Sequence, residues 1–385
     1  MNLGSAFWFA FGELRNSAPV SRSITAFHPL PPPTPTMDLN KIRREIDRID
    51  NSILRALQRR IEWGRLTLKF KKKILSTERE HAIVNSLMER ERSLLSSEVI
   101  EAIYQTIFTE SRRVQAEARP LIAFQGEHGA FTEVACREWN KNLAPIPCAT
   151  NSDVIEGIEQ GVYDFGMLPI ENTIVGRQNH ITALLNQSKL HIVGAISIPV
   201  EECLLVVPRA PLTQLRRVYS HPMALAECKS FIHQNNLDAI EYFDTAGAAQ
   251  WLAENQPDGT AVIAGELAAK YYNLEVARHN VGDNPHAATR FLVVGSEPKS
   301  DGGNKTSISF FVKNEPGSLA AIMNLFADSK INLSHIDSVL DSSGDYVFYV
   351  DLEANVNDAS VAQVMEQVEK LCDSCRVLGC YNEIK

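Results

Sequence analysis

A hydroxyl residue followed by an arginine stands at the leading edge of an apolar run near residue 290. The tripeptide Thr289-Arg290-Phe291 precedes Leu-Val-Val-Gly at 292–295, and an apolar run closed by glycine indicates a buried strand. A hydroxyl beside a guanidinium can donate a proton while the cation holds an anionic substrate. The alternative is a threonine present for its β-propensity and an arginine extended along the surface. The tripeptide alone favours the alternative, so the rest of the chain must decide.

A second group of candidate residues is basic and lies upstream. Arg43, Arg60 and Lys71 fall on one predicted helix. Arg60 and Lys71 are almost three turns apart and share a face, whereas Arg43 lies about 25 Å from Arg60 along the axis. The three can surround one small dianion only if Arg43 comes from a second chain. Ser111 and Gln115 form an i,i+4 pair on another helix, and the alternative for the basic residues is a solvated face.

Length and charge limit the classes of protein to consider. A chain of 385 residues exceeds one core and predicts two or three domains. The net charge is −9, yet residues 38–119 hold 18 Lys and Arg against 13 Asp and Glu, which favours an anionic ligand there. Nucleic acid is not favoured, because the basic residues lack interleaved aromatics or a reader motif. We find no apolar run long enough to span a bilayer.

Cysteine usage indicates a reducing compartment. The seven cysteines are odd in number and scattered, which is typical of a protein without a disulfide framework. Cys372-Asp-Ser-Cys375 is a lone CxxC without a second ligand pair, so free thiols are favoured over zinc. A cytoplasmic location is expected.

The first 36 residues are predicted to be a disordered leader. The apolar stretch 7–11 is short and no basic residue precedes it, which does not fit a secretory signal. Few acidic residues give a faint likeness to an organelle transit peptide, and the prolines at 31–35 indicate a stiff linker. We expect Met37 to be the functional beginning.

Three segments with different periodicities follow. Residues 37–118 are helical, with helices from Asp38 to about Lys73, from a capping box at Thr77, and from 98 to 117. Residues 120–296 alternate strands and helices and predict a two-lobed α/β domain, with lobes at 121–207 and 212–280 and a return of 281–295 to the first. After a linker at 297–304, residues 305–385 predict a βαββαβ ferredoxin-like domain, with a hairpin turn at Gly344-Asp345.

The helical segment resembles the all-α, three-helix chorismate mutase domain, whose chains intertwine as a dimer. The family's motif positions fall on residues of the expected types: Arg43, Arg60, Lys71, Arg79, Glu80, Ser111 and Gln115. The resemblance implies an intramolecular rearrangement in which the substrate is held folded and charge is placed on the breaking ether bond.

The same resemblance implies a role for each side chain of the mutase site. Lys71 and Gln115 would address the ether oxygen, while Arg60 and the partner subunit's Arg43 would clamp the carboxylates. Glu80 would fix the ring hydroxyl. Ser76 stands where the family often has Asp, and Lys72 or Lys73 could compete with Lys71.

The central segment resembles prephenate dehydratase through four motifs in the right order. These are the glycine turn at 123–133, Pro-Ile-Glu-Asn-Thr within 168–176, Tyr-Ser-His-Pro at 219–222, and the tripeptide at 289–291. The resemblance implies loss of CO2 and water from prephenate, with Thr289 donating to the leaving hydroxyl. Arg290 would orient a carboxylate or serve the structure. The candidates for substrate binding are Asn172, Thr173, Ser220, His221, Arg290 and Phe291, and no metal or cofactor is implied.

One departure from the dehydratase pattern follows Pro222. Relatives often carry Gln at the next position and again four residues later, where this chain has Met223 and Glu227. A carboxylate near a dianionic substrate repels it unless protonated or paired. Arogenate, which bears an ammonium group, is therefore the alternative substrate to prephenate.

The last eighty residues resemble an ACT domain, which senses amino acids at domain interfaces. The turn at 315–320 matches the family's ligand loop, so the allosteric candidates are Gly317, Ser318, Leu319, Asp337 and Ser338. Ser318 replaces the usual Ala, and 336–340 lacks the family's Arg and Pro. The resemblance implies inhibition by L-phenylalanine.

Taken together, the chain is predicted to be a multidomain member of the bifunctional chorismate mutase–prephenate dehydratases, the P-proteins of phenylalanine biosynthesis. The expected small molecules are chorismate and prephenate, with L-phenylalanine as effector and no nucleic acid or membrane partner. A homodimer or a higher homo-oligomer is expected. The alternatives are an arogenate dehydratase, a chain that keeps one activity only, and a non-catalytic amino-acid sensor that retains the scaffold.

Overall fold

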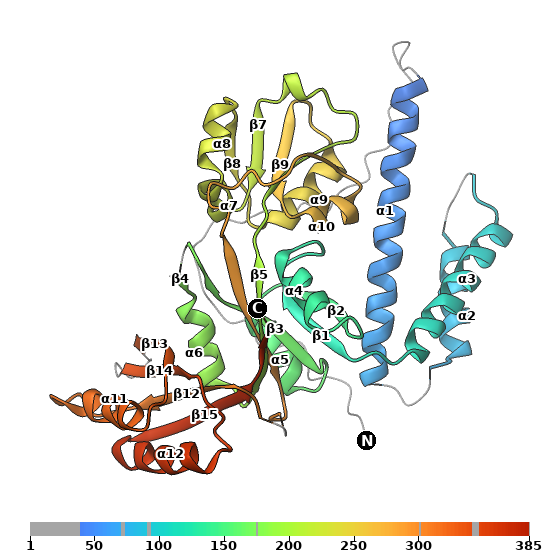
Figure 1. Ribbon diagram of the computed structural model, residues 1–385. Helices are drawn as coiled ribbons and strands as arrows, with labels where there is room; N and C mark the ends of the chain where they lie inside the picture. Colours follow the sequence, from blue (N-terminus) through green and yellow to red (C-terminus); the bar gives the residue numbers. More distant parts are fainter. Residues whose placement is uncertain are drawn as a thin grey trace, which may run out of the picture. The chain divides into compact units, whose positions relative to one another are not determined.

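The computed structural model describes residues 39–70, 74–90, 94–174, 176–299, 302–340 and 346–384 (Figure 1). Residues up to Asp47 form a separate unit, of which the first turns of the first helix are described. Residues 48–385 form the second unit. The predicted leader 1–36, Lys71 with its neighbours 72 and 73, and the hairpin turn at 344–345 lie outside the described residues. Among the helices that are described, none is both long and apolar enough to cross a membrane.

The N-terminal segment is helical, as its apolar periodicity predicts. Its elements are α1 (Leu39–Leu66), a 3₁₀ turn (Thr67–Lys69), α2 (Thr77–Met88) and α3 (Ser97–Ala116). The predicted capping box at Thr77 is wrong, because Thr77 is already helical and Ser76 is the N-cap, without a side-chain cap bond. Ser96 does cap α3, since its hydroxyl accepts from the backbone N–H of Val99.

The first lobe of the central domain is a seven-stranded mixed sheet in the order β16-β5-β11-β3-β1-β2, with β4 on β3. Buried Phe124 and Met167 pack against α4, and buried Leu168 and Ile170 pack against α5 and α6. The elements are β1 (Leu121–Gln125), α4 (Phe131–Trp139), β2 (Ala144–Cys148), α5 (Asn151–Glu159), β3 (Phe165–Asn172), β4 (Gly176–Arg177), α6 (Asn179–Gln187), β5 (His191–Pro199), β11 (Ala288–Gly295) and β16 (Glu383–Ile384).

The second lobe is a five-stranded sheet in the order β10-β6-β9-β7-β8. Its elements are β6 (Cys203–Val206), a 3₁₀ turn (Leu212–Gln214), β7 (Arg217–Ser220), α7 (Pro222–Glu227), α8 (Lys229–Gln234), β8 (Asp238–Glu241), α9 (Thr245–Asn255), β9 (Thr260–Ala264), α10 (Glu266–Tyr272) and β10 (Glu275–Arg278). The predicted boundary at 207–212 is wrong: β6 pairs with β9 and β10, so the chain crosses between the lobes at 200–202. It returns through 279–287, as predicted (Figure 1).

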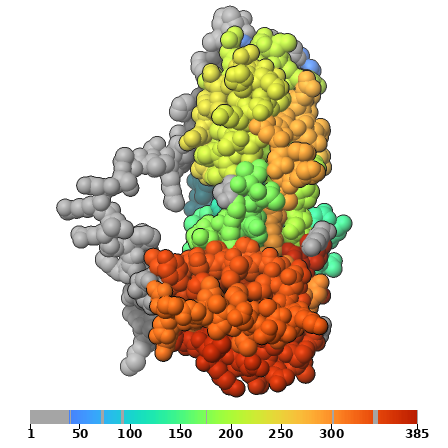
Figure 2. All heavy atoms as spheres, turned by 60° about the vertical axis from the view of Figure 1, so that its left-hand side comes forward, coloured from blue at the N-terminus to red at the C-terminus, as the bar shows by residue number. Residues whose placement is uncertain are grey.

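The C-terminal domain has the predicted βαββαβ order. Its four-stranded antiparallel sheet runs β13-β14-β12-β15, and Figure 2 shows its orange-to-red residues as one continuous body. The elements are β12 (Lys305–Phe311), α11 (Ser318–Asp328), β13 (Leu333–Leu340), β14 (Tyr346–Leu352), α12 (Ala359–Leu371) and β15 (Ser374–Tyr381).

This domain shares a core with the first lobe. Tyr349 and Tyr381 are buried in one apolar cluster with Leu168 and Ile170 of β3. Strand β15 approaches β5 so closely that a Cβ on Gly379 would lie 2.1 Å from the carbonyl oxygen of Ile192. Only glycine fits there, and β16 then joins the first-lobe sheet beside β5. Changes in the C-terminal sheet can therefore be felt by the strands that carry the dehydratase motifs.

Candidate functional site

The ends of strands β3 and β11 bring two of the dehydratase motifs together. Asn172 and Thr289 face each other in the antiparallel register. The side-chain amide of Asn172 donates from Nδ2 to Thr289 Oγ1 over 3.1 Å. Both side chains are buried, at 5% and 8% exposure. The oxygen of the Asn172 amide accepts from the backbone N–H of Ile174 at 2.8 Å, which fixes the orientation of the amide.

This hydrogen bond leaves Thr289 able to act as a donor. A threonine hydroxyl has one hydrogen to donate and two lone pairs to accept with. Because Asn172 donates, the bond occupies a lone pair and leaves the hydroxyl hydrogen for another acceptor. Burial removes competing water, so a donor held in this way is worth more than in solvent. The pair can therefore present an O–H to a leaving oxygen.

The other residues of the two motifs have defined partners. Thr173 Oγ1 accepts from the backbone N–H of Ala288, and its own N–H donates to the Ala288 carbonyl. Ser220, at the end of β7, is fully buried and donates from Oγ to the carbonyl oxygen of Ile263 at 2.7 Å. His221 caps α7, because its Nδ1 accepts from the backbone N–H of Met223 at 3.2 Å.

Arg290 and Phe291 are held inside the structure. Phe291 is 2% exposed and packs in the core beneath α4. Arg290 extends toward the C-terminal domain, where Nη1 lies 2.9 Å from Asp351 Oδ2, Nε lies 2.5 Å from Glu383 Oε1, and Nη2 donates to Tyr381. Protein groups thus occupy the guanidinium. Of the two roles considered for Arg290, orienting a substrate carboxylate or supporting the structure, this arrangement fits the structural one.

The partners of Arg290 were not predicted from the sequence. Burial raises the pKa of Asp351, but Arg290 and the Ser307 hydroxyl outweigh burial, and the net pKa is lowered. Glu383 behaves in the same way, with Lys305 and Arg290 overcoming its burial. One signal was available: Asp351 interrupts the apolar run of β14, and a buried charge requires a partner.

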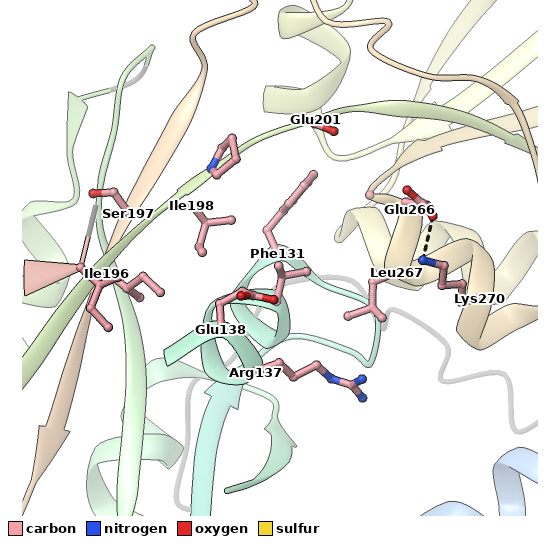
Figure 3. A pocket seen from close by; sticks show the side chains of 14 residues that line it. Phe131, Arg137, Glu138, Ile196, Ser197, Ile198, Glu201, Glu266, Leu267 and Lys270 are labelled. Carbon is pink, nitrogen blue, oxygen red and sulfur yellow. Dashed lines mark ion pairs between the residues drawn. The ribbon is translucent and has the colours of Figure 1, made fainter. Parts of the chain in front are cut away.

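A cavity of about 720 Å³ lies between the two lobes of the central domain. Figure 3 shows Phe131 of α4 projecting into the space between β5 and α10, with the Glu266–Lys270 ion pair on the α10 side. Ile198, the sheet partner of Thr289, forms part of its wall. The site residues predicted from the sequence do not line this cavity.

In the helical segment, several predicted mutase residues come together. Arg60 Nη1 donates to Ser111 Oγ at 3.0 Å, and its guanidinium lies over the ring of Phe108 at 5.2 Å. Gln115 Nε2 donates to the carbonyl oxygen of Gly64 at 2.6 Å and to Thr67 Oγ1 over a longer 3.5 Å. Ser111 and Gln115 are buried. Arg60, Ser111 and Gln115 thus lie together between α1 and α3.

The remaining mutase residues are placed differently. Glu80 forms an ion pair with Arg112 at 2.5 Å, a partner that the sequence analysis missed. Arg79 is exposed. Arg43 belongs to the first unit and is exposed, and Lys71 falls outside the described residues.

In the C-terminal domain the predicted effector residues lie on two elements. Gly317 has φ of 92° and caps α11, a left-handed conformation that glycine adopts readily. Ser318 and Leu319 begin that helix. Asp337 and Ser338 lie on the edge strand β13, where Asp337 Oδ1 accepts from the Ser338 N–H at 2.8 Å. Asp337 also approaches Arg177 of β4 at 3.8 Å.

Three protein families match successive parts of the chain. Residues 42–116 match Chorismate mutase type II, residues 122–299 match Prephenate dehydratase, and residues 306–373 match the ACT domain. Among solved structures, a prephenate dehydratase from Arthrobacter aurescens in complex with L-Phe has a TM-score of 0.62 at 29% identity, and covers 68% of this chain and 89% of that chain. A structure described as a quorum-quenching acylase, GqqA, has a TM-score of 0.64 at 32% identity, and covers 68% of this chain and 97% of that one.

Curated relatives are similar to this chain across all three domains. A bifunctional chorismate mutase/prephenate dehydratase of Aquifex aeolicus is 33% identical over 89% of this chain and 98% of its own length. An arogenate dehydratase/prephenate dehydratase of Arabidopsis thaliana is 36% identical over 71% of this chain and 75% of its own length. With both catalytic domains and the ACT domain present in this order, the chain belongs to the bifunctional chorismate mutase/prephenate dehydratases, which carry out successive steps of phenylalanine biosynthesis.

Proposed function

We propose that Thr289 is the group that assists departure of the ring hydroxyl during the dehydratase reaction. Prephenate loses CO2 as its ring becomes aromatic, and the hydroxyl must leave as water, so the reaction consumes one proton. A neutral threonine is a weak acid and acts by donating a hydrogen bond while the C–O bond breaks. The observation that carries this proposal is the Asn172–Thr289 hydrogen bond, because it leaves the Thr289 hydrogen free to donate.

The neighbouring polar residues supply the remaining contacts to the substrate. Asn172 and Thr173 come from the same motif at the end of β3, while Ser220 and His221 come from the second lobe, so a substrate between them meets both lobes. Their existing hydrogen bonds hold them in place before substrate arrives, which lowers the entropy cost of binding. We assign Arg290 and Phe291 to the support of this site.

Prephenate is the proposed main substrate, and arogenate is the alternative. Some relatives are described as acting on arogenate, and Glu227 stands where a neutral side chain was expected. Incubating the purified chain with chorismate and following prephenate and then phenylpyruvate tests both activities together. Comparing kcat/KM for prephenate and arogenate decides the order of the substrates. Equal or greater turnover of arogenate would reverse it.

We further propose that the mutase site is completed by a second chain. Apolar side chains on α1 and α3 are exposed, among them Ile49 at 38%, Ile53 at 52% and Trp63 at 66% on α1, and Ile103 at 48% on α3. Exposed apolar residues at helical spacing indicate a face covered by a partner. A dimer in which α1 packs against its copy covers this face and brings the partner subunit's Arg43 to the Arg60, Ser111 and Gln115 cluster.

Within that site the proposed roles follow the chemistry of the rearrangement. Arg60 and the partner subunit's Arg43 clamp the two carboxylates, and Lys71 with the side-chain amide of Gln115 stabilises charge on the ether oxygen. Glu80, held by Arg112, fixes the ring hydroxyl. Arg79 lies beside Glu80 and is a further carboxylate ligand. The domain limits that we propose are 37–118 for the mutase, 120–296 for the dehydratase and 305–385 for the regulatory domain, and the expected location is cytoplasmic.

L-Phenylalanine is the proposed feedback inhibitor of the dehydratase. The A. aurescens relative is described in complex with L-Phe, and this chain has the turn at Gly317 that opens α11. The backbone at 317–319 would receive the amino acid, and Asp337 and Ser338 of the edge strand would complete the site. Dehydratase activity should fall in millimolar L-phenylalanine while L-alanine at the same concentration has no effect. Unchanged activity in L-phenylalanine would reject the proposal.

A further inference from the structure

The glycine turn that follows β1 in the first lobe packs directly against α10 of the second lobe. A Cβ on Gly129 would lie 2.6 Å from the Cα of Ala268 in α10, so the two backbones are in contact. The hydroxyl of Tyr272, the last residue of α10, donates to the carbonyl oxygen of His128 at 2.8 Å. One turn of the first lobe is therefore held by one helix of the second lobe.

A buried carboxylate joins the same two elements. Glu133 of α4 is 0% exposed. Its Oε2 accepts from the backbone N–H of Gly129 at 2.9 Å and lies 3.2 Å from His128 Nδ1. Its Oε1 accepts from Arg137 Nη2 at 2.8 Å and from the hydroxyl of Tyr271 in α10, also at 2.8 Å. One oxygen of the carboxylate thus holds the glycine turn, and the other reaches across to the second lobe.

The carboxylate of Glu133 carries its negative charge at neutral pH. Burial raises the pKa of Glu133, but the His128 ring, the Gly129 N–H and the Arg137 guanidinium outweigh burial, and the net pKa is lowered. A hydrogen bond that a charged group accepts in a buried place is stronger than a neutral one. The Tyr271 ring is also stacked on the His128 ring, with centroids 5.0 Å apart. Phenylalanine in place of Tyr271 would keep this stacking and remove only the hydrogen bond.

The two elements that are tied together follow strands whose neighbours carry candidate substrate-binding residues. Strand β1, which leads into the glycine turn, is parallel to β3, which ends at Asn172. Strand β9, which leads into α10, is parallel to β7, which ends at Ser220. The carboxyl ends of parallel strands meet at one edge of a sheet. The tie therefore joins the edge that carries Asn172 to the edge that carries Ser220.

We propose that Glu133 and Tyr271 are positioning residues of the dehydratase, whose hydrogen bond holds the two lobes at the separation at which one substrate touches both. The inference rests on the proposed function, which assigns residues of both lobes to substrate binding. Glu133 and Tyr271 act through those residues and not on the substrate itself. Tyr272, through the carbonyl of His128, is a second tie of the same kind.

This role predicts a specific kinetic change when a tie is removed. A substrate that touches both lobes binds only the held arrangement, so a looser tie lowers the fraction of molecules ready to bind and raises KM in proportion. Once the substrate bridges the lobes, the reacting groups are unchanged, so kcat is kept. A tie that served only the stability of the fold would act differently, because fewer folded molecules would lower the apparent kcat and leave KM unchanged.

The test uses Tyr271→Phe, Tyr272→Phe and the variant with both substitutions in the full-length protein. The matched control is Tyr163→Phe, because the Tyr163 hydroxyl accepts from the Cys148 thiol within the first lobe. Dehydratase kcat and KM for prephenate are measured for each protein. Mutase activity on the same preparations reports that the chain is folded.

The expected changes follow the charge of each acceptor. Tyr271→Phe should raise KM roughly tenfold, because it removes a hydrogen bond to a charged group. Tyr272→Phe should raise KM by less, because the carbonyl of His128 is uncharged, and the variant with both substitutions should have the highest KM. In all three, kcat should stay within about twofold of the parent value. Tyr163→Phe should match the parent in both constants.

A double-mutant cycle tests the pair of Glu133 and Tyr271 directly. Glu133→Gln removes the charge of the acceptor and should raise KM by itself. Adding Tyr271→Phe to Glu133→Gln should then raise KM by a smaller factor than Tyr271→Phe does in the parent, because the two side chains share one hydrogen bond. If the two factors multiply as independent effects, Glu133 is not the group through which Tyr271 acts, and the proposed pair is contradicted.

The outcomes separate this inference from the proposed function. If His221→Ala leaves the KM for prephenate unchanged, the proposed second-lobe contact to the substrate fails and the inference fails with it. If His221→Ala raises KM while Tyr271→Phe keeps the KM of the parent, only the positioning role is overturned. A fall in kcat at constant KM in the tyrosine variants would assign Tyr271 to the stability of the fold and would also contradict the inference. Where the variant with both substitutions does not fold, the two single variants decide.

Discussion

Arg290 Nη1 lies 2.9 Å from Asp351 Oδ2, and this buried ion pair joins the residue after Thr289 to the central strands of the ACT domain. The two side chains are 12% and 4% exposed. Asp351 also accepts from the Ser307 hydroxyl, and Glu383 shares its carboxylate between Arg290 and Lys305. Every charge in the group has an opposite partner. Because β11 carries both Arg290 and Thr289, the ACT domain takes part in holding the dehydratase strand.

Removal of Asp351 should destabilise the chain strongly. Asp351→Ala leaves the Arg290 guanidinium buried with one ion-pair partner missing, and breaking a buried pair costs about 3–5 kcal/mol. Urea unfolding at neutral pH measures the loss as a shift of the midpoint. The control is Glu266→Ala, which breaks an exposed ion pair with Lys270 and should change stability little. Equal midpoints for the two variants would contradict the prediction.

A buried acid at the lobe crossing should make stability fall as the pH rises. The pKa of Glu202 is about 8 in the folded chain, against about 4.3 when unfolded. Between these values the folded state holds a proton that the unfolded state has lost, so the free energy of unfolding decreases with increasing pH. Glu202→Gln should remove that slope. Urea titrations from about pH 5 to about pH 8 give the free energy of unfolding of parent and variant at each pH. If this free energy falls equally steeply with pH in both proteins, the prediction is contradicted.

The sequence was sufficient to identify candidate residues that belong to short motifs in a recognisable order along the chain. Asn172 and Thr289 lie in separate motifs, and the apolar run at 291–294 was enough to expect Thr289 at a strand edge, whereas Asn172 was identified by its motif alone. The sequence could not decide whether Arg290 orients a substrate carboxylate or supports the structure. The partners that decide this, Asp351 and Glu383, lie more than sixty residues away along the chain. The assignment of 203–207 to the first lobe failed for a related reason: an apolar strand reveals its burial, but not which sheet it joins.

Replacing Thr289 should silence the dehydratase and spare the mutase. Thr289→Val keeps the shape of the side chain but removes the donor, and loss of a positioned proton donor lowers kcat by about 10²–10⁴-fold. Thr289→Ser keeps the hydroxyl and should retain much of the rate. Phenylpyruvate formation from prephenate measures the loss, and prephenate formation from chorismate is the internal control. A Thr289→Val protein with normal phenylpyruvate formation would remove Thr289 from the mechanism.

The reverse pattern is expected for the mutase lysine. Lys71→Ala removes the cation proposed to stabilise the breaking ether bond, so conversion of chorismate should fall by about 10²-fold or more, while dehydration of prephenate continues. Lys72 and Lys73 are adjacent and equally basic, so Lys72→Ala and Lys73→Ala are matched controls. A larger loss in either control than in Lys71→Ala would transfer the role to that neighbour.

The composition of the mutase site can be tested by mixing two inactive chains. Arg43→Ala and Lys71→Ala should each abolish mutase activity. If Arg43 serves the partner's site, a hybrid dimer has one site that lacks both residues and one site that is intact. Random pairing makes about half of the dimers hybrids, and one of the two sites in each hybrid is intact. Co-expression should therefore restore mutase activity to about one quarter of that of the parent protein. If Arg43 serves its own chain, both sites of every hybrid remain defective.

A second mixture makes the result specific to the exchange of Arg43. Arg60 and Lys71 are proposed to come from one chain, so Arg60→Ala mixed with Lys71→Ala leaves one defect in each site of the hybrid and should stay inactive. Arg43→Ala mixed with a chain that carries both Lys71→Ala and Arg60→Ala must then recover the same quarter, because the two substitutions fall in the site already lost. Arg43→Ala paired with Arg43→Ala/Lys71→Ala has no intact site and should stay inactive. Recovery in this last mixture would show that Arg43 is dispensable, since neither chain supplies it.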